Sequence, residues 1–307
     1  MDLRRACETV VAVTVTPFDD DGELDARAYS AVVRRAVAAG VTVVTANGNT
    51  GEFYALAPSE VDRAVDLTVE AAGPALVVAG VGHDVQRAVS AAKAAAAAGA
   101  GAVMVHQPLH PHQSVEGWLA YHRAIADAVP DLGLLCYVRD PRVDGARIAQ
   151  LAEACPTLVG IKYAVPDVQA FARAVATVPP ERLAWICGLA ELWAPYFWLA
   201  GARGFTSGLA VVAPGVSLAL LERMRAADLI TAMGVWEVVR PIEEMRARDG
   251  GAMNVAVIKE ALAQLGLCRP SVRLPGTQLS EADRAEVAAI TAGWDRLRVS
   301  RGVSQPA

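Results

Sequence analysis

The sequence predicts a (β/α)8 TIM barrel followed by a C-terminal helical extension, and three observations support this. Eight short apolar runs recur along the chain, mostly about 25 to 35 residues apart, which is the length of a βα unit. Helical patterns occupy the intervals between them. From about residue 218 the pattern becomes wholly helical. We therefore expect a barrel over residues 1–217, carrying the active site, and an extension over residues 218–307.

The eight runs are nearly continuous in apolar residues, as expected for strands that are covered on both faces. They lie at residues 10–15, 41–46, 75–81, 101–106, 133–138, 158–162, 183–188 and 204–209. An open doubly wound sheet is the alternative arrangement. No G-x-G-x-x-G follows a strand, however, and "GVGHD" is only a near miss. Right-handed crossovers close eight successive units naturally, which favours the barrel.

The helical patterns carry recognisable start and stop signals. Those between strands include residues 25–40, 84–99, 114–130 and 167–179. The second begins at a capping residue, Asp84, and stops at Gly99, while the third begins at Ser114 and stops before Pro130. The first presents one apolar face, made of Tyr29, Val32, Val33, Ala36 and Val37. Further helices are expected within residues 218–249, 254–266 and 280–298.

The composition restricts the class of protein. The chain has 307 residues, of which 54% are hydrophobic and 20% charged, with a net charge of −5. Mild acidity without a basic cluster gives no reason to expect nucleic acid as a partner. No apolar run has the length of a membrane span, and the N-terminus does not resemble a signal peptide. Five scattered cysteines without C-x-x-C spacing suggest reduced thiols and a cytoplasmic protein.

Lys162 is the first candidate for chemistry, because "LVGIKYAV" surrounds it with apolar, glycine and tyrosine neighbours. Desolvation lowers the pKa of a buried lysine below its reference value of about 10.4. A neutral amine can attack a ketone and form a Schiff base. The alternative is a strand-end lysine whose tip reaches solvent or a carboxylate. The other two lysines, Lys93 and Lys259, lie on helices and are expected at the surface.

Two further features follow strands, at the end of a barrel where active sites lie. Tyr137 closes the fifth strand, beside the sixth, and its phenol could relay protons; a structural tyrosine is the alternative. In "NGNTGEFYAL", after the second strand, two glycines permit a tight turn that exposes backbone N–H groups. Asn49 and Thr50 add side-chain donors. This loop could hold a substrate carboxylate, or it could be a plain turn.

The loop after the fourth strand, "VHQPLHPHQS", contains His106, His110 and His112. Their spacing matches no standard zinc pattern. We expect these histidines to hydrogen-bond substrate hydroxyls or to line the mouth of the barrel, rather than to bind a metal.

Together these motifs resemble the dihydrodipicolinate synthase / N-acetylneuraminate lyase family of Schiff-base barrel enzymes, over nearly the full length. "VTVTPFDDDGELD" is similar to the family's opening strand and loop, and "GNTGEFYALAPSE" to its G-T-T-G-E-x-x-x-L-T-x-x-E signature. "GIKYA" resembles the lysine strand, and "AGARGFTSGLAVVAP" the G-x-x-G-x-I-S-x-x-x-N-x-x-P stretch. The segment from "NVAVIKEALAQLG" to "PGTQLS" is similar to the family's C-terminal helix and tail.

The resemblance implies that Lys162 forms an imine with a 2-oxo acid and that Tyr137 shuttles protons. The resulting enamine can attack an aldehyde, undergo the reverse cleavage or expel a β-hydroxyl. The resemblance also implies a homotetramer and no metal or organic cofactor. The implied substrate-binding residues are Gly48, Asn49, Thr50, Gly188, Thr206, Ser207, His106 and His110.

Three departures from the synthase pattern bear on the substrate. Asn49 stands where the synthase and lyase usually have threonine or serine, and an amide cannot relay a proton as a hydroxyl does. The loop "HQPLHPH" lacks the tyrosine that the synthase lends to a neighbouring subunit. "YVRDPR" is closer to the Y-N-R-D of the keto-deoxy-glucarate dehydratase branch. Arg139 or Arg142 could bind a distal carboxylate as a bidentate fork.

The leading prediction is therefore a Schiff-base lyase acting on a 2-oxo acid, either pyruvate or a 2-keto-3-deoxy sugar acid, by aldol chemistry or dehydration. Dihydrodipicolinate synthase, which condenses pyruvate with aspartate semialdehyde, is the first alternative. A catalytically inactive keto-acid sensor and a metal-dependent aldolase that uses the histidine loop are alternatives of other classes.

Overall fold

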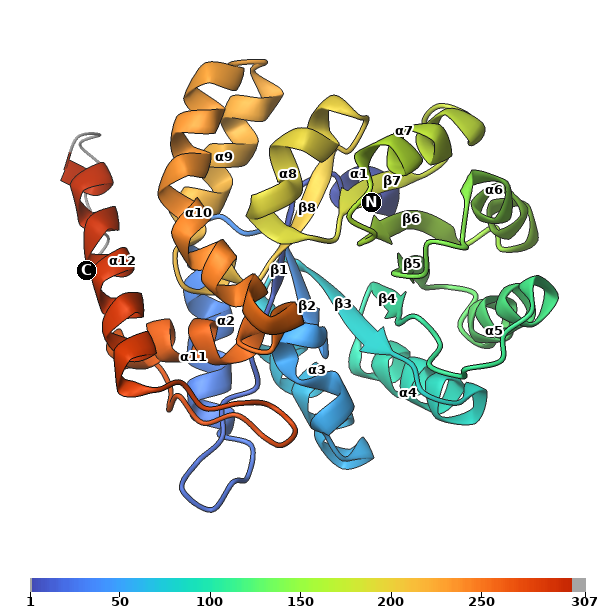
Figure 1. Cartoon of the computed structure of the whole chain (residues 1–307). Coiled ribbons are helices and arrows are strands. Elements are labelled where there is room, and N and C mark those ends of the chain that lie inside the picture. The colour runs from blue at the N-terminus through green and yellow to red at the C-terminus, as the bar shows by residue number, and fades with distance from the viewer. Residues whose placement is uncertain (1, 300–307) are drawn as a thin grey trace.

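The computed structural model describes residues 2–299, and these form a closed barrel of parallel strands in the order β1 to β8 (Figure 1). The barrel closes where β1 pairs with β8 as well as with β2. The strands are β1 Val10–Val13, β2 Val43–Ala46, β3 Leu76–Val81, β4 Ala102–Val105, β5 Gly133–Val138, β6 Leu158–Tyr163, β7 Ala184–Cys187 and β8 Gly204–Ser207. The closure confirms the predicted (β/α)8 barrel and excludes the open sheet.

A helix follows each strand and covers the outside of the barrel (Figure 1). The predicted caps are present. Asp84 accepts a hydrogen bond from the Arg87 N–H at 3.0 Å, and Ser114 accepts one from the Gly117 N–H at 2.9 Å. The helices are α2 Ala26–Ala38, α3 Pro58–Ala72, α4 Val85–Ala98, α5 Val115–Ala128, α6 Gly145–Ala154, α7 Val168–Thr177, α8 Ala190–Leu199 and α9 Pro214–Arg225.

The alternation of side chains along each strand divides the apolar residues between two layers. Ile161 and Tyr163 on β6 pack outward, under the helices. The inward side chains fill the barrel, among them Val11, Val43, Val78, Met104, Leu135 and Ile186. The short N-terminal helix α1, Leu3–Ala6, packs against this inner cluster. Lys162, between the two outward residues of β6, therefore points into the barrel.

The C-terminal extension consists of α10 Leu229–Gly251, α11 Asn254–Gln264 and α12 Glu281–Val299. In Figure 1 these orange and red helices lie on one flank of the barrel; α10 packs on α8 and α9, and α11 and α12 pack on α10. The boundary predicted between residues 217 and 218 falls inside α9, which begins at Pro214. The division into two domains remains a prediction, and residues 1 and 300–307 of the predicted domains lie outside the described residues.

Within residues 2–299, no helix combines the length and the apolar character that crossing a membrane requires.

Candidate active site

Lys162 and Tyr137 lie side by side near the C-terminal ends of β6 and β5. The two residues are paired in the strand register, and each is the last but one of its strand. The Lys162 amine nitrogen, Nζ, is 4.0 Å from the centroid of the Tyr137 ring, and both residues are 4% exposed. The structure thus brings together the two residues in which the sequence predicts the chemistry.

The surroundings of Lys162 favour a neutral amine. Burial lowers the pKa of Lys162 to about 7, and the positive charge of Arg139 contributes to this lowering. Among the described residues, no carboxylate pairs with the amine. Burial also raises the pKa of Tyr137 above its ordinary value, although Arg139 opposes this. Near neutral pH a substantial fraction of the amine is therefore neutral, beside a protonated phenol.

Gly188, which follows β7, provides the space that the lysine side chain occupies. A Cβ atom at this position would lie 2.8 Å from Ala164 Cβ and 3.0 Å from Lys162 Cγ. A larger residue would therefore displace the lysine from its place beside Tyr137. This close packing alone accounts for a glycine at position 188, and the predicted role of Gly188 in substrate binding stays a prediction.

The loop after β2 brings an amide to the Tyr137 phenol. Asn49 begins the short 3-10 helix η1, Asn49–Gly51, and its Nδ2 donates a hydrogen bond to Tyr137 Oη at 3.1 Å. Asn49 Oδ1 is buried and has no hydrogen bond to any described residue. The loop lies close against β1, because a Cβ atom on Gly48 would be 2.3 Å from Val13 Cγ1. Gly48 and Asn49 are thus both held at the mouth of the barrel.

Three other predicted substrate-binding residues also lie near the ends of the strands. Thr50 is buried beside Gly208, where a Cβ atom would lie 3.2 Å from Thr50 Oγ1. Thr206 donates a hydrogen bond to the Cys187 carbonyl at 3.5 Å. Ser207 is fully buried and donates to Glu191 Oε1 at 2.5 Å. The hydroxyl of Ser207 is therefore engaged within the protein.

Glu191, at the start of α8, was not identified from the sequence. It is fully buried, and its Oε1 accepts hydrogen bonds from Ser207 and Ser217, each at 2.5 Å. Burial raises the pKa of this carboxyl to about 7, and the negative charge of Glu243 contributes. No local pattern marks this residue, because a glutamate in the first turn of a helix is ordinarily exposed.

His106 is buried rather than exposed at the mouth of the barrel, whereas the role predicted for the exposed His110 stays a prediction. His106 is buried beneath the loop after β2; its Nε2 donates to the Asn47 carbonyl at 2.8 Å, and its ring stacks on Phe53 with centroids 4.2 Å apart. Burial lowers its pKa to about 3, so the ring is neutral. His110 is exposed, and its hydrogen bonds are to His112 and Gln113, in its own loop. Within the described chain, no group of three or more His, Cys, Asp or Glu residues is placed to hold a metal ion.

The structure distinguishes the two candidate arginines. Arg142 is exposed and is engaged by the neighbouring Asp140, with Nε 3.0 Å and Nη2 2.6 Å from carboxylate oxygens. The Arg139 guanidinium has no hydrogen bond or ion pair with any described residue. It lines a cavity of about 210 Å³ that reaches the loop after β2 and the C-terminal extension. The cavity lining includes Asn49, Glu52, Tyr54, Arg139, Val272 and Arg273.

The expectation for Lys259 was wrong. Lys93 is exposed as predicted, but Lys259 on α11 is completely buried and forms an ion pair with Glu52. The apolar run "VAVI" that precedes Lys259 was a signal of burial. The adjacent Glu260 made the lysine look like half of a surface pair, but Glu260 is itself buried.

A desolvated lysine without a carboxylate partner, at the C-terminal end of a barrel strand, is suited to form a Schiff base with a carbonyl substrate. Comparison with known proteins identifies the family. Residues 6–292 match the Dihydrodipicolinate synthetase family. The chain belongs to this family of enzymes and is a lyase.

Individual relatives carry two different names. A probable 5-dehydro-4-deoxyglucarate dehydratase of Xanthobacter autotrophicus is 32% identical over 94% of this chain and 96% of its own length. A 4-hydroxy-tetrahydrodipicolinate synthase of Exiguobacterium is 30% identical over 94% of this chain and 98% of its own. The crystal structure of dihydrodipicolinate synthase from Bacillus clausii superposes with a TM-score of 0.92. The match covers 95% of this chain and 99% of that one, with 41% sequence identity.

Proposed function

We propose that this protein is a Schiff-base lyase that dehydrates or cleaves a 2-keto-3-deoxy sugar acid carrying a second carboxylate. One observation carries the choice of a diacid: the Arg139 guanidinium lines the cavity beside Asn49 and has no acidic partner among the described residues. An unpaired guanidinium is suited to bind a carboxylate through two parallel hydrogen bonds. The likeness to relatives named as probable 5-dehydro-4-deoxyglucarate dehydratases supports the same substrate class.

In the proposed reaction, Lys162 Nζ attacks the C2 ketone and forms a carbinolamine. Tyr137 donates its proton to the hydroxyl of the carbinolamine, which leaves as water and gives the protonated imine. The tyrosinate then removes a proton from C3, and the electron pair forms the enamine. The reprotonated Tyr137 donates to the C4 hydroxyl, which the enamine expels as water. Water then hydrolyses the resulting protonated imine, which releases the product, restores the neutral amine and returns a proton to the Tyr137 phenolate.

The remaining residues would orient the substrate. The turn at Gly48 to Thr50 would hold the carboxylate next to the ketone, and Arg139 would hold the distal one. Asn49 would orient the phenol through its hydrogen bond of 3.1 Å to Tyr137. Two fixed carboxylates would place C2, C3 and C4 between the amine and the phenol, which is the contribution of substrate positioning to catalysis.

Dihydrodipicolinate synthase is the second candidate, and the 41% identity to a crystal structure of that enzyme favours it. Two features of the sequence count against it. Asn49 replaces a hydroxyl that would relay protons. The loop after β4 contains no tyrosine; the exposed apolar side chain of this loop is Leu109, which is 62% exposed. Synthase activity would show that neither departure prevents the condensation.

We further propose that the protein is a cytoplasmic homotetramer. An apolar groove on the outside of the barrel supports association with a second copy, because large exposed apolar patches commonly mark protein interfaces. The groove is lined by Val168, Leu192, Trp193, Tyr196, Leu199, Ala200 and Trp236. Light scattering that gives the mass of a monomer at micromolar concentration would contradict this assembly.

A substrate panel tests the proposed reaction. The panel contains 5-dehydro-4-deoxyglucarate, the corresponding monocarboxylic keto-deoxy acid, and pyruvate with aspartate semialdehyde. We expect the diacid to have the highest kcat/KM. Arg139→Met should lower that value by about 10- to 100-fold, because a hydrogen bond to a charged group is lost, and should change the monoacid little.

The matched control is Arg142→Met, since Arg142 is engaged by Asp140 at the surface. We expect the control to stay within about two-fold of the wild type. Equal turnover of the diacid and the monoacid would overturn the assignment of the diacid. Synthase activity alone would support the second candidate, and thermal stabilisation by a keto acid without turnover would support the sensor.

A further inference from the structure

The loop that presents Asn49 contains a backbone conformation that is energetically unfavourable for a non-glycine residue. Its last residue, Glu52, has φ of 59° and ψ of 32°, in the left-handed region that non-glycine residues rarely adopt. Such a conformation persists when surrounding contacts determine it. Within the loop, the Glu52 N–H donates to the Asn49 carbonyl at 3.1 Å, so the two residues are directly joined.

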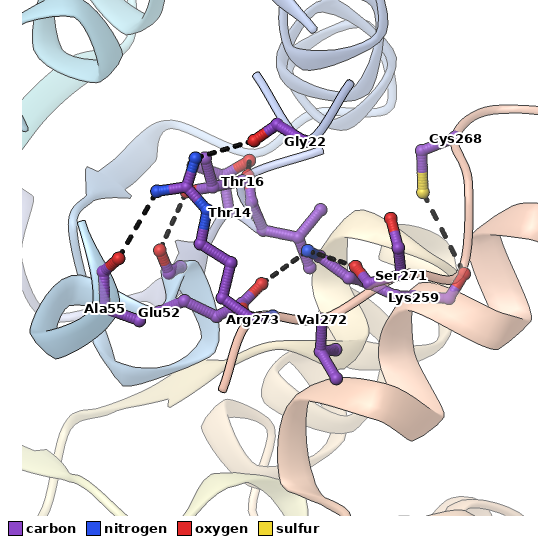
Figure 2. A network of polar contacts seen from close by, with 12 residues as sticks. Thr14, Thr16, Gly22, Glu52, Ala55, Lys259, Cys268, Ser271, Val272 and Arg273 are labelled. Atoms are coloured by element: carbon purple, nitrogen blue, oxygen red, sulfur yellow. Dashed lines mark hydrogen bonds and ion pairs between the residues drawn. The ribbon is translucent and has the colours of Figure 1, made fainter. Parts of the chain in front are cut away.

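The C-terminal segment provides the contacts that hold Glu52 (Figure 2). Lys259 on α11 donates to Glu52 Oε1, and it donates a second hydrogen bond to the Ser271 carbonyl at 2.7 Å. The backbone N–H of Arg273 donates to Glu52 Oε2 at 2.7 Å. Both carboxylate oxygens are therefore occupied by donors from a segment more than 200 positions away in the sequence, since Lys259 is 207 and Arg273 is 221 residues from Glu52.

The Arg273 side chain fastens the same segment to the barrel. Its two terminal nitrogens bind the two Glu60 carboxylate oxygens, each at 2.6 Å, and Nη1 also donates to the Ala55 carbonyl at 3.3 Å. The Phe18 ring packs beneath both cations, with Lys259 Nζ 4.1 Å and Arg273 Cζ 4.2 Å from its centroid. We call Glu52, Lys259 and Arg273 the latch.

We propose that the latch is a positioning element of the active site, by which the C-terminal extension fixes the loop that binds the 2-oxo acid carboxylate. Two observations connect it to the site. Glu52 is joined through the backbone to Asn49, which contacts Tyr137. Glu52 and Arg273 also line the same cavity as Asn49 and Arg139. The inference rests on the proposed function, because the ligand that it positions is the proposed 2-oxo acid.

The latch should control binding without controlling the nucleophile. No hydrogen bond, ion pair or ring contact joins Glu52, Lys259 or Arg273 to Lys162 in the described part of the chain. Loosening the latch would displace the turn at Gly48 to Thr50, and with it the donors for the carboxylate. The ionisation of the Lys162 amine depends on burial and on Arg139, and neither would change.

The test measures how Lys162 is trapped by pyruvate and borohydride in the full-length protein, by mass spectrometry. Variants Glu52→Gln, Lys259→Met and the double variant are compared with the wild type at a temperature where all are folded. The matched control is Arg248→Met, which breaks an exposed ion pair with Glu286 within the same extension, with side chains 42% and 40% exposed. The double variant removes both buried charges, so it carries the test if Lys259→Met alone does not fold.

We expect the half-saturating pyruvate concentration to rise about 10- to 100-fold in Lys259→Met and in the double variant, as a displaced binding loop would cause. The pH midpoint of trapping should remain as in the wild type, because the ionisation of Lys162 is unchanged, and the control should be unaffected. If the latch only stabilises the fold, the trapped fraction will fall while half-saturation is unchanged, which overturns the inference. If the wild type traps neither pyruvate nor another 2-oxo acid, the proposed function fails, and the latch role with it.

Discussion

Lys162 and Lys259 are both buried lysines, yet their electrostatic surroundings are opposite. Each follows an isoleucine at the end of an apolar run, "LVGIK" in one case and "VAVIK" in the other. Lys162 has no carboxylate partner among the described residues and lies over the face of Tyr137. Lys259 is paired with Glu52 and hydrogen-bonded to Ser271.

The difference shows that burial alone does not identify a catalytic lysine. Burial lowers the pKa of both amines. Only at Lys259 does an adjacent carboxylate oppose the lowering and engage the amine in an ion pair. A lysine becomes a nucleophile when it is desolvated without such a partner, and becomes a structural element when a partner is present.

The largest effect is expected from removing the unpaired lysine. Lys162→Met should lower turnover of any 2-oxo acid by at least about 10⁴-fold, because no other group can form the imine. It should also raise the free energy of unfolding by roughly 0.5–2 kcal/mol, since a buried amine without a partner is replaced by an apolar side chain. Borohydride trapping and urea denaturation measure the two effects. An adduct that persists in the variant would place the imine on another residue.

Removing the paired lysine should have the opposite effect on stability. Lys259→Met leaves the Glu52 carboxylate buried without its cation, so we expect the free energy of unfolding to fall by about 3–5 kcal/mol. Glu52→Gln combined with Lys259→Met should recover part of this loss. Urea denaturation of the same variants is the measurement. The control Arg248→Met breaks an exposed ion pair with Glu286, and we expect it to lower the free energy of unfolding by only about 0–1 kcal/mol. If Lys259→Met is as stable as the wild type, the ion pair with Glu52 does not stabilise the fold, and the proposed difference between the two lysines fails.

The smallest effect concerns the pH dependence. Because the amine is nucleophilic when neutral, kcat/KM should rise with pH through a midpoint near 7 and then level off.

The folded pKa of Lys162 lies below its ordinary value of 10.5, so the unfolded state binds more protons between these two values. This residue therefore makes the free energy of unfolding increase with pH across that interval.

Arg139→Met should move the midpoint to higher pH, by less than about one unit, since a positive charge that opposes protonation is removed. Arg142→Met and Lys259→Met should leave the midpoint in place. A pH–rate profile for each variant is the measurement. A midpoint near 10 in the wild type would mean that the amine is not desolvated in solution.

Much of the fold follows from local patterns. All eight predicted strands occur, and the caps at Asp84 and Ser114 are present, because an apolar run or a capping residue acts on its immediate neighbours. Lys162 and Tyr137 were identified in the same way, as polar residues at the ends of apolar strands. The boundary near residue 217 was less well defined, because α9 begins at Pro214 and the helical pattern continues beyond it.

The rest of the site depended on contacts that no local pattern contains. His106 was expected at the mouth of the barrel but is buried against Phe53, which lies 53 positions earlier in the sequence. The choice between Arg139 and Arg142 depended on which guanidinium turns toward Asp140 and which toward the cavity. Side-chain direction within a loop is set by the fold around it, and therefore cannot be read from residue types.

The sequence by itself determined the barrel, the position of the lysine on its sixth strand and the tyrosine beside it, because these depend on periodicity and on the order of βα units. Only the tertiary structure decided which buried lysine is free and which is paired. Lys259 and its partner Glu52 are 207 residues apart, and the barrel must close and the extension must pack before they meet. The charge state of a buried group depends on its neighbours in space, and these neighbours cannot be identified from the sequence alone.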